Sequence, residues 1–227
     1  MTRALKAERK ELVKTRVLLV DDHPIVRKGM AQLIEAEGNL EICGETGDAA
    51  EAISMIAKLK PDLAVIDVSL SGNDGIDLIK QIKARGDEVK VLVASMFDET
   101  LYAERALHAG AAGYINKNEA ATKIVEAIQQ VLRGKVYLSD KMTDRLLTRV
   151  AHGEEDINRS PINSLSDREL EVFRLIGDGL TTRQIAEKLH LSTKTIETYR
   201  DHIKAKLNLK HNTELIRRAV QWTLSQG

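Results

Sequence analysis

The chain has 227 residues with equal numbers of acidic and basic side chains, 34 of each, and 43% of its residues are hydrophobic. This length favours two compact units, and the composition fits a globular protein with a buried core. The single cysteine, Cys43, excludes a disulfide framework or a multi-cysteine metal site and favours a reducing compartment.

No apolar run approaches the ~20 residues of a membrane span, and residues 1–14 contain no apolar signal core. We therefore expect a cytoplasmic protein without a membrane partner. The charge also divides along the chain: from Pro161 onward there are 11 Lys and Arg residues against 8 Asp and Glu, and the remainder has 23 against 26. A basic segment joined to an acidic one favours an output module attached to a regulatory module.

Short aliphatic runs alternate with helix-like stretches in the first part of the chain. The predicted strands are Arg16–Val20, Glu41–Glu45, Leu63–Val68, Lys90–Met96 and Gly113–Asn116. The predicted helices lie near residues 24–37, 48–59, 74–85, 99–109 and 119–133. Strands that are apolar on both faces and alternate with helices predict an α/β domain with a five-stranded, parallel, doubly wound sheet of the flavodoxin-like kind.

Acidic residues follow two of these predicted strands. Asp21 and Asp22 come directly after the first strand, and Asp67 lies at the end of the third. In a doubly wound sheet these ends meet where the strand order reverses, so we expect the three carboxylates to converge. Clustered carboxylates repel one another, and Mg²⁺ is the expected partner because it takes few protein carboxylates and leaves room for a phosphoryl oxygen.

A hydroxyl and an ammonium group are expected at the same edge of the sheet. The fourth strand ends in Ser95, and Lys117 follows the fifth. Beside a metal-bound carboxylate these groups fit the formation of an aspartyl phosphate at Asp67. Any one of these residues taken alone is also explained as a helix cap or a solvated charge, but their coincidence at the strand ends favours phosphoryl chemistry.

The segments VLLVDDHPIVRKG, LAVIDVSL, VLVASM and GYINK resemble the receiver domain of bacterial two-component response regulators. The resemblance implies that Asp67 accepts a phosphoryl group from a histidine kinase. It further implies that Mg²⁺ is held by Asp22, Asp67 and the backbone carbonyl of Ser69, while Asp21 acts through water.

The same resemblance implies a switch pair formed by Ser95 and Tyr114. In the family the hydroxyl moves toward the phosphate and the aromatic ring turns inward behind it. Tyr114 lies three residues before Lys117, as the family pattern requires. An aromatic residue in a strand is also explained by ordinary packing.

The pattern changes after Leu132. One helix-like stretch, Asp140–Val150, precedes the polar run AHGEEDINRSPINS, and only helical patterns follow, near residues 166–177, 181–189, 193–208 and 212–224. Two short helices joined by His190 and Leu191 predict a helix-turn-helix in a small all-α domain. We therefore assign residues 15–136 to the receiver, 137–163 to a linker with one helix, and 164–227 to a helix-turn-helix domain.

The stretch LSDRELEVFRLIGDGLTTRQIAEKLHLSTKTIETYRDHIKAKL resembles the LuxR-type DNA-binding domain, so the whole chain is similar to NarL/FixJ-type transcriptional regulators. The resemblance implies that Ser192–Leu207 is the recognition helix, laid in the major groove of duplex DNA. Helical spacing independently turns Ile196, Tyr199, Ile203 and Leu207 toward a small core. The opposite face is then free to meet DNA.

Basic residues flank that face and are expected to contact phosphates, while backbone N–H groups at the start of the preceding helix are expected to do the same. The predicted DNA-binding residues are Thr181, Thr182, Lys194, Thr195, Glu197, Thr198, Arg200, Asp201, Lys204, Lys206 and Lys210. For Asp201 we expect an intrahelical pair with Lys204, and for Glu197 acceptance of a hydrogen bond from a cytosine amino group.

The sequence thus predicts a phosphorylation-dependent, DNA-binding transcriptional regulator, not an enzyme beyond its own phosphorylation and dephosphorylation, that forms a homodimer when phosphorylated. An adaptor whose helical module binds a partner protein is one alternative. A Mg²⁺-dependent phosphatase is another, but it usually needs an acid two residues after the nucleophile, where Ser69 stands. The apolar residues of the last predicted helix are explained equally well by dimerisation and by core packing.

Overall fold

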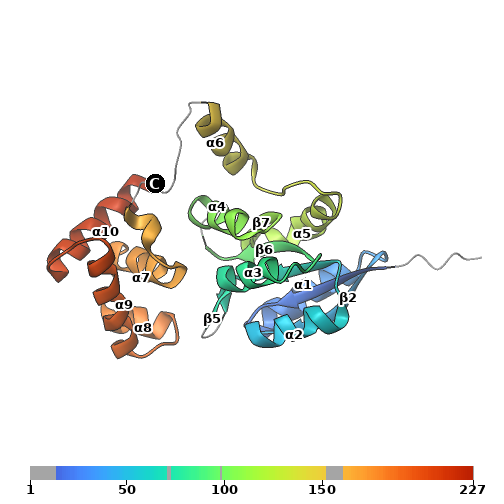
Figure 1. Cartoon of the computed structure of the whole chain (residues 1–227), viewed down its shortest axis with the longest axis horizontal. Helices are drawn as coiled ribbons and strands as arrows, with labels where there is room; N and C mark the ends of the chain where they lie inside the picture. Colours follow the sequence, from blue (N-terminus) through green and yellow to red (C-terminus); the bar gives the residue numbers. More distant parts are fainter. Residues whose placement is uncertain (1–13, 71–72, 98, 152–160, 227) are drawn as a thin grey trace, which may run out of the picture. The chain divides into compact units, whose positions relative to one another are not determined.

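The computed structural model describes residues 14–70, 73–97, 99–151 and 161–226 (Figure 1). The chain divides into two compact units between Arg145 and Leu146. Most of the polar run that was predicted to link the domains, residues 152–160, lies outside the described residues.

The described part of the first unit contains one five-stranded parallel sheet with the strand order β2-β1-β3-β6-β7. The strands are β1 (Thr15–Val20), β2 (Leu40–Thr46), β3 (Leu63–Ile66), β6 (Lys90–Ser95) and β7 (Gly113–Asn116). Because β1 and β3 are hydrogen-bonded neighbours, the order reverses between them, and their carboxyl ends lie side by side. The predicted doubly wound fold is confirmed.

A small antiparallel pair follows β3 and was not predicted. It joins β4 (Ser69–Leu70) to β5 (Asn73–Asp74). Strands of two residues carry no readable periodicity, which explains why the sequence pattern did not indicate them.

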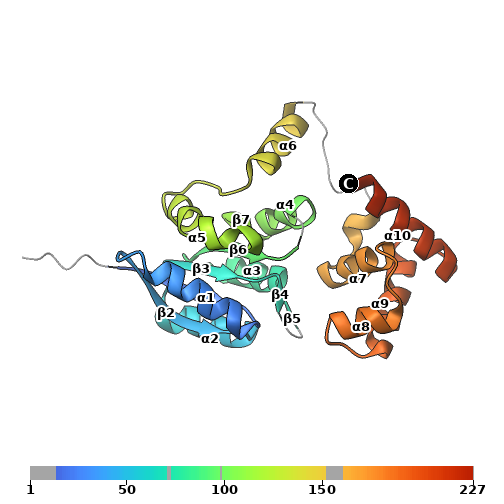
Figure 2. The ribbon, with the colours of Figure 1, turned by 180° about the vertical axis from the view of Figure 1, so that it is seen from behind.

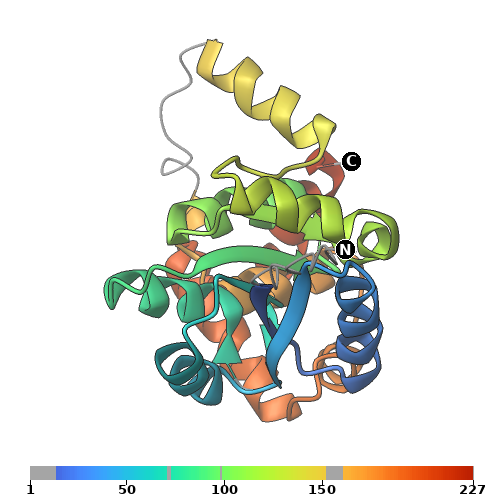
Figure 3. The same ribbon diagram turned by 90° about the vertical axis from the view of Figure 1, so that its right-hand side faces the viewer.

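Five described helices cover both faces of the sheet (Figures 2 and 3). They are α1 (Pro24–Glu35), α2 (Ala49–Leu59), α3 (Gly75–Ala84), α4 (Glu99–Ala109) and α5 (Lys117–Leu132). The fifth helix begins two residues earlier than predicted, since the side chain of Asn116 caps it by accepting a hydrogen bond from the Asn118 N–H at 2.9 Å.

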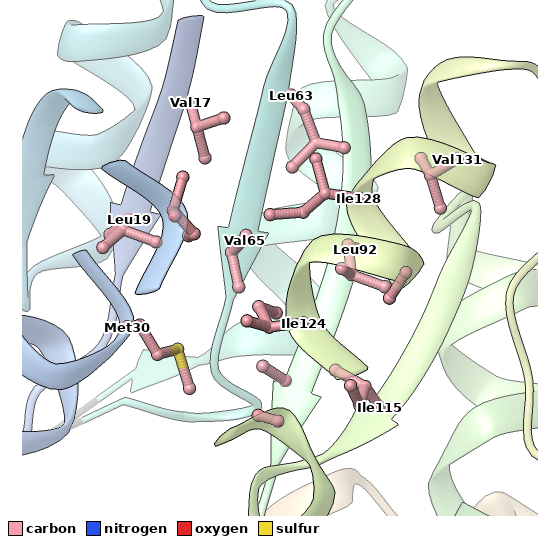
Figure 4. Close-up of a cluster of buried hydrophobic side chains, with 14 of the residues drawn as sticks. Val17, Leu19, Met30, Leu63, Val65, Leu92, Ile115, Ile124, Ile128 and Val131 are labelled. Carbon is pink, nitrogen blue, oxygen red and sulfur yellow. The ribbon is translucent and has the colours of Figure 1, made fainter. Parts of the chain in front are cut away.

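The core of the first unit lies between the sheet and the helices α1 and α5. Side chains from alternate positions of the strands meet those from one face of each helix (Figure 4). The labelled members are Val17, Leu19, Met30, Leu63, Val65, Leu92, Ile115, Ile124, Ile128 and Val131, and each is less than 10% exposed. Burial of each of these aliphatic side chains stabilises the folded state by about 1.5–3 kcal/mol. The sheet is therefore stable, and it fixes the positions of the residues at its edge.

After α5 the chain returns to the edge of the sheet and pairs with β7 through Tyr137. Tyr137 donates its N–H to the Ala112 carbonyl at 3.1 Å and accepts a hydrogen bond from the Tyr114 N–H at 2.8 Å, so it bridges to β7. The predicted end of the receiver at residue 136 lies one residue before this edge pairing. Local patterns cannot indicate such a pairing, because its partners are separated by more than twenty residues. Helix α6 (Asp140–Ala151) follows.

In the second unit the described residues form a short 3₁₀ turn, Pro161–Ser164, and four helices. The helices are α7 (Asp167–Gly177), α8 (Thr182–Lys188), α9 (Thr193–Lys206) and α10 (Asn212–Gln226). Capping boxes start α7 at Ser166 and α8 at Thr181, which fixes the beginnings of these helices where the sequence predicted them. The predicted helical architecture of this unit is confirmed.

The core of this unit is built from all four helices. Phe173 of α7, Ile185 of α8, Ile203 of α9 and Leu215 of α10 are fully buried. Helix α9 turns Ile196 and Ile203 inward as predicted, while Tyr199 and Leu207 are only half-buried.

Candidate phosphoacceptor site and nucleic-acid interface

Two neighbouring strands bring the predicted carboxylates together. The Asp67 N–H donates to the Val20 carbonyl at 2.8 Å, so Asp67 leaves β3 directly beside the point where Asp21 leaves β1. Ligand atoms of Asp21, Asp22, His23 and Asp67 all lie within 4.8 Å of one another. Asp21 and Asp67 are only 4% and 2% exposed, so these two carboxylates of the acidic site are shielded from bulk water.

Lys117 supplies the positive charge of the acidic site. Its Nζ lies 2.6 Å from Oδ2 of Asp21 and 2.7 Å from Oδ2 of Asp67, and its side chain is 5% exposed. Burial raises the pKa of Asp67 above its ordinary value, and the charge and hydrogen bond of Lys117 offset only part of this. One ammonium against three carboxylates leaves net negative charge in a sheltered place.

A hard divalent cation fits this donor set. Carboxylate oxygens are the ligands that Mg²⁺ prefers, and the residual negative charge favours a cation that keeps several waters. Asp21, Asp22 and Asp67 are the residues that could hold it. The Ser69 N–H donates to Oδ1 of Asp67 at 3.2 Å, whereas a metal bond from the Ser69 carbonyl stays a prediction.

The two predicted switch residues are connected through Phe97. Ser95 is fully buried, and its Oγ accepts a hydrogen bond from the Phe97 N–H at 3.2 Å. Tyr114 is also fully buried, and its hydroxyl donates to the Phe97 carbonyl at 3.0 Å. Sequence reasoning missed Phe97, because nothing in the sequence indicates that its main chain lies between Ser95 and Tyr114.

His23 is a second residue that sequence reasoning missed. Its Nδ1 lies 2.7 Å from Oδ1 of Asp22, and its side chain is 58% exposed at the edge of the acidic site. The available signal was its position directly after two aspartates in the run DDH.

The helix-turn-helix consists of α8 and α9. A side-chain contact joins them, since the Thr182 hydroxyl donates to Oε1 of Glu197 at 2.8 Å. Thr181 caps α8 through its own hydroxyl. The exposed surface of α9 presents Lys194, Glu197, Thr198 and Asp201, which is the face predicted to meet DNA.

Two of the predicted phosphate contacts are placed differently. Arg200 is only 7% exposed, so its side chain lies in the helical core and not on the exposed face of α9. Lys206 is held by an ion pair, with Nζ 2.6 Å from Oε2 of Glu169 in α7. In the folded unit the Arg200 side chain is buried and the Lys206 ammonium is paired with Glu169, and contacts of these two residues with DNA phosphates stay predictions.

The remaining predicted residues of the helical unit are exposed or half-buried. The expected pair between Lys204 and Asp201 is confirmed, with Nζ and Oδ1 3.0 Å apart. Thr195 donates its N–H to the capping hydroxyl of Ser192 at 3.0 Å. Lys210 is exposed at the start of α10, where its N–H donates to Glu214 at 2.8 Å.

Comparison with known proteins identifies two domains in the chain. Residues 17–129 match the response regulator receiver domain, and residues 163–219 match the luxR family of bacterial regulatory proteins. The transcriptional regulatory protein LiaR of Bacillus subtilis is 36% identical over 201 residues, which are 88% of this chain and 93% of LiaR. The oxygen regulatory protein NreC of Staphylococcus carnosus is 33% identical over 210 residues, 91% of this chain and 97% of NreC.

A solved structure is similar over both units. RcsB from Salmonella enterica serovar Typhimurium, bound to promoter rprA in the presence of the phosphomimetic BeF₃⁻, has a TM-score of 0.56 at 28% identity. The match covers 90% of this chain and 97% of that chain. The chain therefore belongs to the NarL/FixJ-type response regulators, which combine a receiver domain with a LuxR-type helical domain. Within the described residues, no helix is both long enough and apolar enough to cross a membrane.

Proposed function

We propose that this response regulator accepts a phosphoryl group on Asp67 from a histidine kinase in the cytoplasm, and that phosphorylation promotes a homodimer that binds duplex DNA. The observation that carries the first step is the position of Lys117, whose ammonium group bridges Asp21 and Asp67 at the carboxyl edge of the sheet. Only one phosphoryl group is taken up per chain, so the protein acts as a switch and not as an enzyme with its own substrate turnover.

In the transfer step, an Oδ atom of Asp67 forms a bond to phosphorus while the bond between phosphorus and the kinase imidazole nitrogen breaks. The imidazole leaves and takes up a proton. Lys117 favours the ionised form of Asp67, opposing the effect of burial, and neutralises charge on the incoming phosphoryl oxygens. Asp21, Asp22 and Asp67 would hold Mg²⁺, which would supply further positive charge beside the carboxylate.

Ser95 is the residue that responds to the negative charge of the phosphoryl group on Asp67. Its buried hydroxyl is an acceptor for the Phe97 N–H and can donate to a phosphoryl oxygen by turning toward Asp67. That movement changes the surroundings of Phe97 and therefore of Tyr114, whose hydroxyl bonds to the Phe97 carbonyl. The result is a shift in an equilibrium between two conformations of the receiver.

The phosphorylation step is tested by incubating the full chain with acetyl phosphate and Mg²⁺ and measuring its intact mass. The wild type should gain the mass of one phosphoryl group, and Asp67→Asn should gain none. Asp77→Asn is a matched control, since Asp77 lies on the exposed surface of α3 and pairs with Lys80. Uptake by Asp67→Asn at the wild-type level would show that the assignment is wrong.

The DNA-binding step is supported by the basic and polar residues on the exposed face of α9. In vitro selection from random duplexes, with and without acetyl phosphate, should enrich a sequence more strongly with the phosphodonor. Lys194→Ala should weaken binding to all duplexes alike and lower the salt dependence, as expected for a phosphate contact. Arg183→Ala, which removes an equally exposed charge from α8, is the control. Binding that is unaffected by salt would contradict the proposal.

The dimerisation step is tested by sedimentation of the full chain with and without beryllofluoride and Mg²⁺. We propose that α10 contributes to the dimer, because Ile216 and Leu224 on this helix are 43% and 77% exposed. Beryllofluoride should shift the wild type toward the dimer, and Leu224→Ser should reduce this shift. An unchanged monomer after confirmed phosphorylation would contradict the dimer.

A further inference from the structure

One hydrogen-bonded contact joins the start of α4 to the start of α6. Oε1 of Glu99 accepts a hydrogen bond from the Ser139 main-chain N–H at 2.9 Å, and Oε2 accepts one from the Ser139 hydroxyl. Glu99 is the first residue of α4, and Ser139 directly precedes α6. A single carboxylate therefore holds both polar hydrogens of a residue forty positions away.

Ser139 is also the residue that starts α6. Its Oγ accepts a hydrogen bond from the Met142 N–H at 3.2 Å, and its carbonyl accepts one from the Thr143 N–H at 2.9 Å. Met142, in the first turn of the helix, is fully buried. Because the hydroxyl that caps α6 is itself held by Glu99, the position of α4 determines where α6 begins.

The same contact lies close to the switch residues along the chain. Glu99 follows two residues after Phe97, whose N–H bonds to Ser95 Oγ and whose carbonyl accepts from Tyr114. Tyr114 reaches the same segment from the other side, since its N–H donates to the carbonyl of Tyr137, two residues before Ser139. Phe97 and Tyr137, which both form hydrogen bonds with Tyr114, thus lie two residues from Glu99 and Ser139 in the sequence.

We propose that Glu99 and Ser139 form a latch that holds the first turn of α6 to α4, and that phosphorylation of Asp67 opens it. In the absence of the phosphoryl group, the Phe97 main chain is bonded to Ser95 and Tyr114 and keeps Glu99 in reach of Ser139. When Ser95 turns to the phosphoryl group, this segment moves, the latch breaks, and α6 loosens. Since the division between the two units falls within α6, between Arg145 and Leu146, the latch connects the phosphoacceptor to the output domain along the chain. This inference rests on the proposed phosphorylation.

Hydrogen exchange of the full chain, followed by mass spectrometry, tests the latch directly. In the wild type, beryllofluoride with Mg²⁺ should speed exchange in peptides that contain residues 140–145 by about fivefold, the factor for losing ~1 kcal/mol of hydrogen bonding between Glu99 and Ser139. Glu99→Ala removes the latch but leaves the capping hydroxyl of Ser139 in place. In this variant exchange should already be fast without beryllofluoride, and beryllofluoride should add little.

Two further variants separate the latch from general destabilisation. Glu99→Gln keeps one acceptor for Ser139 and should give an intermediate exchange rate. Glu88→Ala removes an exposed acid from the same unit and should behave as the wild type. In Glu99→Ala, peptides from β1 and β3 should exchange as in the wild type, which shows that the unit remains folded.

The outcomes also separate this inference from the proposed function. Wild-type exchange of α6 in Glu99→Ala, or the full wild-type response to beryllofluoride in this variant, overturns the latch. So does a wild type that takes up a phosphoryl group on Asp67 without any change in α6. If Asp67 takes up none, the proposed function fails, and the basal exchange rate of Glu99→Ala still decides whether the contact holds α6.

Discussion

The hydroxyl of Thr182 donates a hydrogen bond to Oε1 of Glu197 at 2.8 Å, and this contact connects the first turn of α8 to the exposed face of α9. The other carboxylate oxygen, Oε2, lies 3.8 Å from Nε of the buried Arg200. Glu197 therefore contacts two parts of the helix-turn-helix itself. We expect these contacts to position the two helices, whereas the contact of Glu197 with a cytosine stays a prediction.

We expect Glu197→Ala to weaken binding to all DNA duplexes by a similar factor, on the order of three- to tenfold, as for one lost hydrogen bond that orients two helices. Thr182→Ala should cause a similar loss, and the double variant should lose little more, because both changes remove the same contact. Affinities are measured by fluorescence anisotropy with the selected sequence and with cytosine-substituted duplexes. Loss confined to duplexes with one particular cytosine would instead support base reading by Glu197.

Removal of the ion pair between Lys206 and Glu169 is expected to lower the stability of the second unit. Lys206→Met should lower its free energy of unfolding by about 1–2 kcal/mol, a modest value for a bond to a buried carboxylate because the lysine side chain is 40% exposed. Trp222, the single tryptophan of the chain, packs on Phe173 at 5.5 Å between ring centroids, so its fluorescence reports unfolding of this unit. Arg183→Met removes a largely exposed pair with Glu187 and should cost less than about 0.5 kcal/mol.

The ion pair between Lys206 and Glu169 also predicts that the stability of the second unit depends on pH. Burial acts to raise the pKa of Glu169, but hydrogen bonds from Lys206 and the Ser166 main chain outweigh it, so the pKa lies below its ordinary value of 4.5. A lowered carboxyl pKa contributes stability that is present above the ordinary value and is lost as the pH falls through the folded value. The difference in the free energy of unfolding between wild type and Lys206→Met, measured with urea, should therefore be constant near neutral pH and shrink below pH 4.5. A difference independent of pH would contradict this.

The strands and helices could be predicted because their patterns are local. Continuous aliphatic runs such as Leu63–Ile66 indicate buried parallel strands, and capping boxes indicate where helices begin. The convergence of Asp21 and Asp67 also followed from strand order alone. By contrast, the bond between Tyr137 and Tyr114 depends on contacts remote in sequence, which no local pattern contains.

Arg200 shows where the burial of a charged side chain was not expected. It lies four residues after Ile196 and three before Ile203, so helical spacing alone turns it toward the core. Its charge led to the opposite prediction, because buried arginines are rare. Lys206 was assigned to DNA for a similar reason: its partner Glu169 is 37 residues away, and nothing in α9 indicates the pairing.

The charges of the acidic site predict that removal of Lys117 raises the affinity of the site for Mg²⁺. Lys117→Met removes the ammonium group that pairs with both Asp21 and Asp67, so the first unit should unfold at a lower temperature without Mg²⁺. The site then carries one more net negative charge, and its affinity for Mg²⁺ should rise on the order of tenfold. Calorimetry should show a larger Mg²⁺-dependent rise in Tm for this variant than for the wild type. Lys123→Met, on the exposed face of the same helix, should respond as the wild type.

The approach of α3 to the phosphoacceptor predicts that Gly75 tolerates no side chain. A Cβ at Gly75 would lie 2.1 Å from the Asp67 carbonyl oxygen and 2.7 Å from the Val68 Cα, and both are backbone atoms that cannot move without shifting β3. Gly75→Ala should therefore cost about 2–3 kcal/mol and reduce phosphoryl uptake by Asp67. Hydrogen exchange of the β3 amides measures the first effect, and intact mass after acetyl phosphate treatment measures the second.

Gly29 is the matched control for this change. It lies within α1, and a Cβ there would meet no atom within 4 Å. Gly29→Ala should therefore stabilise the first unit by about 0.5–1 kcal/mol, since alanine loses less conformational entropy in a helix, and leave phosphoryl uptake unchanged. Opposite signs for the two substitutions would show that close packing of α3 on Asp67, and not helix propensity, sets the requirement for glycine at position 75. Equal effects would contradict the structure at this point.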